Sequence, residues 1–137
     1  MAVEIYVLSD RRLKSLTEWQ RAIDAESFPF PLRLAADASF DDLNGFLPAR
    51  YENAPSGFEC DHWDSRSIIA DYPHIGFGHA WKYALAFRFG VKPGELESAW
   101  MAATAYARAT RGLVFDTEEG KLFQPDEAPR VIRKIEK

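Results

Sequence analysis

Four side chains in the middle of the sequence are of the types that bind metals or act as nucleophiles. They are Cys60, His62, His74 and His79. Two histidines with a carboxylate can hold zinc or iron, and a cysteine beside a histidine base can attack an electrophile. Their spacing matches no metal-binding motif, and no glycine-rich stretch leads into a helix as a phosphate-binding loop does. We therefore predict no metal centre and no cofactor.

The nucleophile hypothesis depends on how one predicted strand places Cys60 and His62. Residues two apart on a strand share a face but lie about 7 Å apart, while Asp61 points to the other face. That distance is too long for direct proton transfer, so His79 would have to approach from elsewhere in the fold. Because burial of Cys60 as a small apolar side chain is the simpler interpretation, we name no catalytic residue. A small enzyme using Cys60, His62 or His79 stays open as an alternative.

Acidic and aromatic residues between Phe46 and Tyr83 form a second candidate site. More rings lie in or beside predicted loops here than one small core requires, and exposed rings among charged residues are typical of protein-binding surfaces. Ordinary packing of the rings inside loops is the alternative. The candidate binding residues are Glu59, Asp61, Trp63, Asp64, Tyr72 and Phe77.

Composition limits the partners of the chain. It has 137 residues with a net charge of −4, and 47% of its residues are hydrophobic. Negative charge disfavours nucleic-acid binding, because a phosphate backbone requires a basic surface, and it favours a basic protein partner. A single cysteine excludes an intrachain disulfide. No apolar run reaches the length of a membrane span and no signal peptide begins the sequence, so we expect a cytoplasmic protein that does not bind membranes.

The clearest predicted element is a helix from Pro93 to Arg111. Its apolar residues recur at spacings of three and four, its five alanines make it thin, and Gly112 is expected to end it in the left-handed conformation. A predicted strand from Trp81 to Phe89 alternates bulky and small side chains. We expect the thin helix to pack on the bulky face of this strand and to form the centre of the core.

Shorter elements complete the expected fold. A strand is predicted from Val3 to Leu8, and a helix from Ser15 to Glu26 in which Ser15 and Glu18 form a capping box. The segment Ser65 to Tyr72 is ambiguous. Further predictions are an edge strand from Leu32, strands Phe46–Tyr51 and Gly57–Trp63 with a turn at 53–57 between them, a hairpin of 113–116 with 121–123, and a helix that begins at Pro125.

The order of these elements favours one domain of the α+β class over residues 1–137. Short turns join the middle strands, and such strands pair antiparallel. We therefore expect two layers, in which two main helices pack on one face of a mostly antiparallel sheet and a short C-terminal helix follows.

Residues 106–128 resemble the last part of a group of small bacterial proteins. The segment joins the end of a helix, Gly112, the sequence Val-Phe-Asp, the acidic turn Glu118–Gly120 and a helix led by Pro125. The group consists of proteins of unknown function, and some of them are immunity proteins of toxin–immunity pairs. The resemblance implies a small, acidic, cytoplasmic protein that binds and masks a partner, and it supplies no catalytic residue.

The leading hypothesis is thus a bacterial protein-binding module, an immunity-type inhibitor of a toxin, and an enzyme is the less favoured class. A third possibility is a homo-oligomeric structural protein. In that case a second copy would cover one face of the sheet at Trp81 to Phe89 and produce a homodimer.

Overall fold

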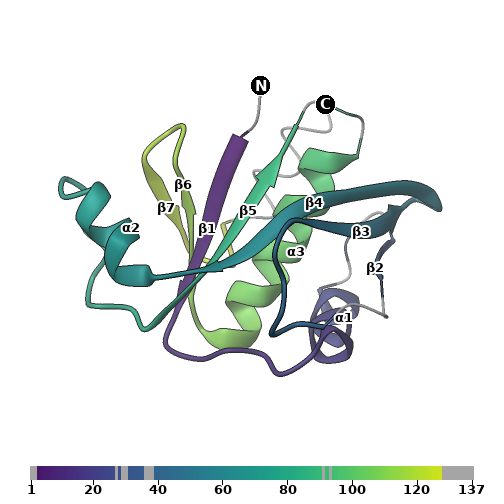
Figure 1. Cartoon of the computed structure of the whole chain (residues 1–137), viewed down its shortest axis with the longest axis horizontal. Helices are drawn as coiled ribbons and strands as arrows, with labels where there is room; N and C mark the ends of the chain where they lie inside the picture. The colour runs from purple at the N-terminus through teal and green to yellow at the C-terminus, as the bar shows by residue number, and fades with distance from the viewer. Residues whose placement is uncertain are drawn as a thin grey trace.

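The computed structural model describes residues 3–26, 28, 31–35, 39–90, 92 and 94–127. In this part of the chain, seven antiparallel strands form one sheet in the order β2-β3-β4-β5-β1-β6-β7, accompanied by three helices (Figure 1). The predicted α+β class is therefore confirmed. The elements are β1 (Val3–Ser9), α1 (Leu16–Ala25), β2 (Leu32–Leu34), β3 (Phe46–Tyr51), β4 (Ala54–Trp63), α2 (Ser65–Asp71), β5 (Tyr83–Phe89), α3 (Glu95–Thr110), β6 (Leu113–Asp116) and β7 (Lys121–Phe123).

The first strand lies inside the sheet. β1 pairs with both β5 and β6, so the first strand of the chain lies beside a strand from its last quarter. Successive residues of each strand point to opposite faces. We call the face that contacts α3 the inner face and the opposite one the outer face. In Figure 1, α3 lies behind β4 and β5.

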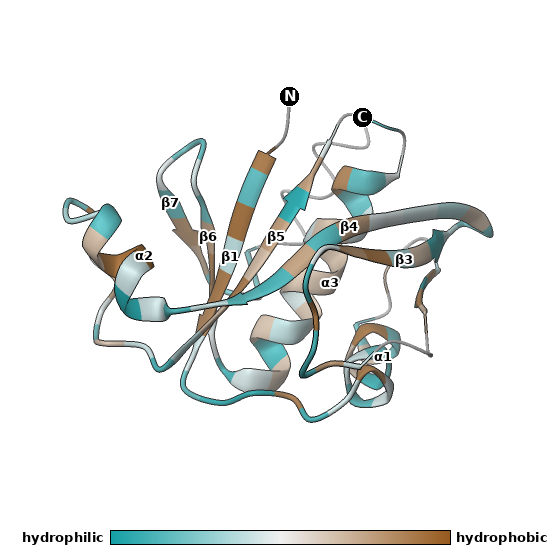
Figure 2. Ribbon diagram, viewed as in Figure 1, coloured by the Kyte–Doolittle hydropathy of each residue, from teal (hydrophilic) through white to brown (hydrophobic). Residues whose placement is uncertain are grey.

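The inner face carries the larger of two buried clusters. Leu85, Phe87 and Phe89 of β5 lie in this cluster together with Trp100 and the alanines at 99, 102, 103, 105 and 107 of α3. The small side chains let the helix backbone approach the rings of the strand closely. Figure 2 shows how hydrophobic and hydrophilic residues are distributed along these elements.

The strand predicted from Trp81 to Phe89 begins two residues before the observed strand β5. Trp81 precedes β5 and packs with the outer cluster, where its indole nitrogen donates to the carbonyl oxygen of Phe77 at 2.8 Å. Tyr83 starts the strand but is 40% exposed. The bulky residues of this strand that pack with α3 are thus Leu85, Phe87 and Phe89. The segment before Tyr83 turns away and covers the other side of the sheet.

The prediction for the end of α3 is also corrected. The left-handed residue is Arg111, with φ of 58°, and Gly112 is not in that conformation. Glycine is required at 112 for another reason: a Cβ there would lie 2.3 Å from the carbonyl oxygen of Leu8. At the other end, the helix follows Gly94 at φ of 87°, and Pro93 lies outside the described residues.

Helix α1 is capped as predicted and also protects the edge of the sheet. The Ser15 hydroxyl accepts from the Glu18 backbone amide at 3.0 Å. The Glu18 carboxylate accepts from the backbone amide of Lys14 instead of that of Ser15. The Gln20 amide group bonds to the backbone of β2, donating to Leu32 O at 2.9 Å and accepting from Leu34 N at 2.7 Å. Gln20 therefore fills the place that a further strand would take, which is a known protection of edge strands.

Three loop predictions change in detail. The β3–β4 turn consists of Glu52 and Asn53, both at positive φ, so that β4 begins at Ala54 and includes Gly57. A two-residue turn of this kind suits a tight hairpin better than the longer predicted turn. The ambiguous segment forms α2, capped by Asp64. The β6–β7 hairpin is present, whereas the predicted C-terminal helix falls largely on residues outside the described ranges.

A second buried cluster covers part of the outer face. Ile68 of α2 and Phe77 of the following loop pack on Tyr6, Leu8 and Phe115 of β1 and β6, together with Ala84 and Ala86 of β5. The outer face of β5 is therefore covered within the chain at Ala84 and Ala86, while Arg88 stays exposed; a homodimer remains a prediction. Among the described helices, none has the length and apolar character that crossing a membrane requires.

The contact at Gly112 gives the first test of this fold. We expect Gly112→Ala to lower the free energy of unfolding by about 2 kcal/mol, because the added methyl group must push the β1 backbone away. The matched control is Gly76→Ala, where a Cβ meets nothing within 4 Å, and it should change stability by less than about 0.5 kcal/mol. Urea unfolding measures both; equal stability of the two variants would contradict the close approach.

Candidate functional site

The structure separates the residues of the enzyme hypothesis. Cys60 is fully buried on the inner face of β4, and burial raises the pKa of its thiol well above the usual value. His62 is half-buried, with Nε2 2.8 Å from the carbonyl oxygen of Phe40 and 3.2 Å from a guanidinium nitrogen of Arg12. Desolvation lowers the pKa of His62. No hydrogen bond joins His62 to Cys60 or His79 in the described part of the chain.

His79 belongs to a different part of the surface. Its Nε2 lies 2.8 Å from a carboxylate oxygen of Asp10, whose other oxygen accepts from the Lys82 amide at 3.1 Å. Burial raises the pKa of Asp10, but these hydrogen bonds outweigh it and bring the pKa below its ordinary value. The nearest hydroxyl in sequence, that of Ser9, donates to Arg11 O instead. This pair ties the loop before β5 to the end of β1.

Within the described ranges, no three of the His, Cys, Asp and Glu side chains are grouped so that they could hold a metal ion. His74 contacts the ring of Tyr72, and this contact involves neither His62 nor His79.

The six predicted binding residues divide into two groups. Glu59, Asp61 and Trp63 share the outer face of β4, where Trp63 is 43% exposed and Glu59 is also exposed. Asp61 is partly committed to the fold, since its carboxylate accepts from the Gly45 amide at 2.7 Å. These three residues face solvent beside one another, as a binding surface requires.

The second group has structural roles. Asp64 accepts from the Arg66 amide at 3.0 Å and so caps α2. Phe77 is buried against Phe115, with ring centroids 5.3 Å apart, and Tyr72 packs on the same ring at 4.8 Å. We therefore build the site on the first group.

The most exposed aromatic ring among the described residues is that of Phe46, which is not one of the predicted site residues. Phe46 is 57% exposed on the outer face of β3, directly opposite Glu59. The end of its ring lies against Gly57, where a Cβ would come within 2.4 Å of the ring. The signal was present in the sequence: a glycine inside a strand often marks a place where another group approaches the backbone closely.

Trp63 is also supported from below. Its ring contacts that of Tyr6 at a centroid distance of 6.1 Å in an edge-on arrangement, and Tyr6 is itself buried against Phe115. The Tyr6 hydroxyl donates to the carboxylate of Glu4, and burial raises the pKa of this phenol above its usual value. The indole of Trp63 is therefore held by Tyr6 on one side and is exposed to solvent on the other.

We call the outer surface of β2, β3 and β4 the open face, because α2 and its following loop cover only the strands beyond it. Its side chains include Arg33, Phe46, Pro48, Arg50, Pro55, Glu59 and Trp63. At its border, Arg88 faces both Glu59 and Glu4 across neighbouring strands and binds the Glu4 carboxylate at 2.8 Å.

The chain matches no family model, no curated protein and no solved structure. The function must therefore be inferred from the open face itself.

The burial of Cys60 makes a prediction that bears on the enzyme alternative. At about pH 8, alkylation of Cys60 by iodoacetamide should be more than about a hundredfold slower in the folded chain than in guanidinium, because the thiol is inaccessible and disfavoured as a thiolate. The control variant C60A/K121C carries its thiol at the exposed first position of β7 and should react rapidly without denaturant. Rapid native labelling of Cys60 would restore the alternative.

Proposed function

We propose that this protein is a protein-binding module of the inhibitor type, and that it binds its partner with the open face. The observation that carries the proposal is the placement of Phe46 and Trp63. Each ring is more than 40% exposed, both lie on one face of adjacent strands, and each is held from below by Gly57 or Tyr6.

Fixed aromatic rings are effective anchors for a protein partner. Phenylalanine and tryptophan bury large areas, and a ring already held in place loses little conformational freedom on binding. Residues of this kind dominate many protein interfaces. The remaining large exposed ring in the described residues, Tyr83, stands apart: it continues the inner-face series of β5, and the Arg12 guanidinium lies 5.7 Å from its centre.

The acidic side chains between the two rings favour a basic partner. Glu59 and Asp61 lie between Phe46 and Trp63 on the open face, and Arg88 neutralises only part of their charge because it is bound to Glu4. Opposite charges on a partner would speed association and fix its orientation. This arrangement fits an immunity-type protein, which masks a toxin by surface complementarity and needs no catalytic group of its own.

The proposal can be tested by co-expression with candidate toxins encoded beside this gene. The chain should restore growth of cells that make its cognate toxin, and F46A/W63A should abolish protection. We expect the purified double variant to bind the toxin at least about a hundredfold more weakly, since two anchors of about 2 kcal/mol each are lost.

Tyr83→Ala is the matched control, because it removes an exposed ring from outside the open face, and it should protect as the original chain does. Thermal unfolding of each variant establishes that it is folded. Full protection by folded F46A/W63A would overturn the proposal.

A further inference from the structure

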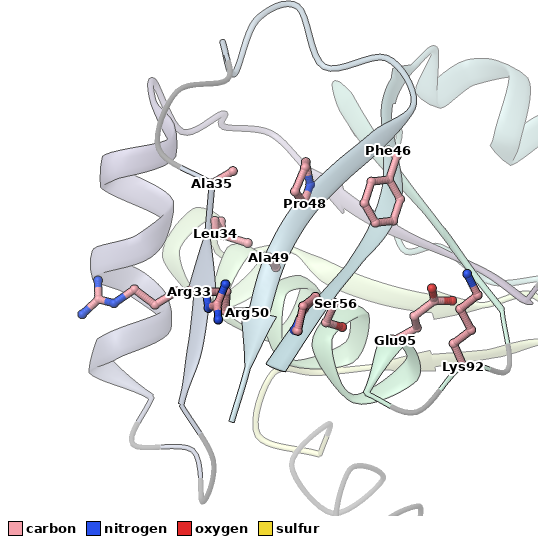
Figure 3. A pocket seen from close by; sticks show the side chains of 11 residues that line it. Arg33, Leu34, Ala35, Phe46, Pro48, Ala49, Arg50, Ser56, Lys92 and Glu95 are labelled. Carbon is pink, nitrogen blue, oxygen red and sulfur yellow. The ribbon is translucent and has the colours of Figure 1, made fainter. Parts of the chain in front are cut away.

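A cavity lies at the β2–β3 end of the open face. Its volume is about 630 Å³. Figure 3 shows Arg50 toward one end of this cavity and Lys92 and Glu95 at the other, with Phe46 and Pro48 on β3; Arg33 is at the border, and its side chain extends past β2 away from Arg50. A cavity of this size is sufficient for several side chains of a bound peptide.

The charges of this cavity oppose the net charge of the chain. Arg33 and Arg50 occupy directly facing positions on β2 and β3. Like charges at facing positions destabilise a sheet. No carboxylate of the described residues forms an ion pair with either arginine or with Lys92; Arg50 donates only to the backbone oxygen of Asn53.

The single carboxylate that lines the cavity does not neutralise these charges. Glu95 accepts from the Gly90 amide at 3.0 Å, which ties it to the loop before α3. The cavity is therefore lined by three cationic side chains and one carboxylate that already accepts a hydrogen bond, in a chain whose net charge is −4. Such a site attracts an anionic ligand.

The lining between the charges is apolar. Phe46, Pro48 and Pro55 contribute to it. A small inorganic anion would pair with the arginines and leave this surface exposed. A nucleic acid requires an extended basic surface, and three cations around an apolar lining are a poor match for a phosphate backbone.

We propose that this groove binds an acidic peptide segment in which carboxylates flank an apolar side chain. The carboxylates pair with Arg33, Arg50 and Lys92, and the apolar side chain packs on Phe46 and the prolines. The Arg50 end of the site lies about 14 Å along β4 from Glu59, which is four residues beyond the partner of Arg50, whereas Phe46 is shared with the proposed partner-binding surface. It goes beyond the proposed function, because its ligand has the opposite charge and it does not require a toxin.

Fluorescence anisotropy with a defined probe tests this proposal. The probe is a labelled synthetic peptide in which leucine and phenylalanine lie between glutamates. The full chain should bind it at low salt, and more weakly when salt is added, while the same peptide with lysines in place of glutamates should not bind. A peptide of glutamates alone should bind more weakly, because it has no group for the apolar lining.

Two double variants with the same change of net charge separate the groove from general electrostatics. R33E/R50E should weaken binding of the probe at least about tenfold, whereas K14E/K121E, whose lysines lie elsewhere on the surface, should change it less than about twofold. If R33E/R50E fails to fold, R33Q/R50Q replaces it. This variant should also melt at the same or a higher temperature, since it removes repulsion between the facing arginines.

Several results would overturn the proposal. They are absence of binding, equal weakening by both charge variants, and tighter binding of a single-stranded oligonucleotide than of the acidic peptide. Failure of the growth assay would leave these measurements unaffected, because they need no partner protein.

Discussion

The packing of Trp19 between the two long helices and the sheet determines the rest of the structure. This residue is fully buried, its indole nitrogen donates to Ala102 O at 2.9 Å, and the rings of Phe58, Phe87 and Tyr106 surround it at 5.4 to 6.3 Å. The hydrogen bond is possible because the alanines of α3 leave its backbone accessible. Since a buried indole without a partner would be costly, this contact fixes α1 in both position and rotation.

The position of α1 in turn determines the open face. Gln20 follows Trp19 directly, and its amide reaches the backbone of β2 on both sides of Arg33. A three-residue edge strand has few hydrogen bonds of its own, so this contact helps to hold β2 against β3. The register of β2 places Arg33 opposite Arg50. The basic groove is therefore a consequence of an interaction in the core on the opposite face of the sheet.

The sequence predicts elements whose causes are local. The capping box of Ser15 and Glu18, the alanine-rich helix and the alternation of β4 can all be recognised in short windows. What the sequence could not show depends on contacts between distant segments. Gly112 was assigned to a helix ending, whereas the carbonyl oxygen of Leu8 requires it. Phe77 was placed in a binding surface, whereas α2 and β6 enclose it. The basic groove was the hardest part to predict from the sequence. It depends on the pairing of β2 with β3, which places Arg33 opposite Arg50 although the two are 17 positions apart.

Net charge was a poor guide to the open face for the same reason. Strand register, which composition does not reveal, decides which charges face one another. Where β1, β5 and β4 meet, Arg88 lies between Glu4 and Glu59 and the charges are paired. Where β2 and β3 meet, two arginines face each other without a carboxylate from the described residues. A cross-strand pair contributes about 0.2–1 kcal/mol, with the sign set by the charges. The same sheet thus gains stability at one end of this surface and loses it at the other, and an anion bound at the unpaired end would reverse that loss.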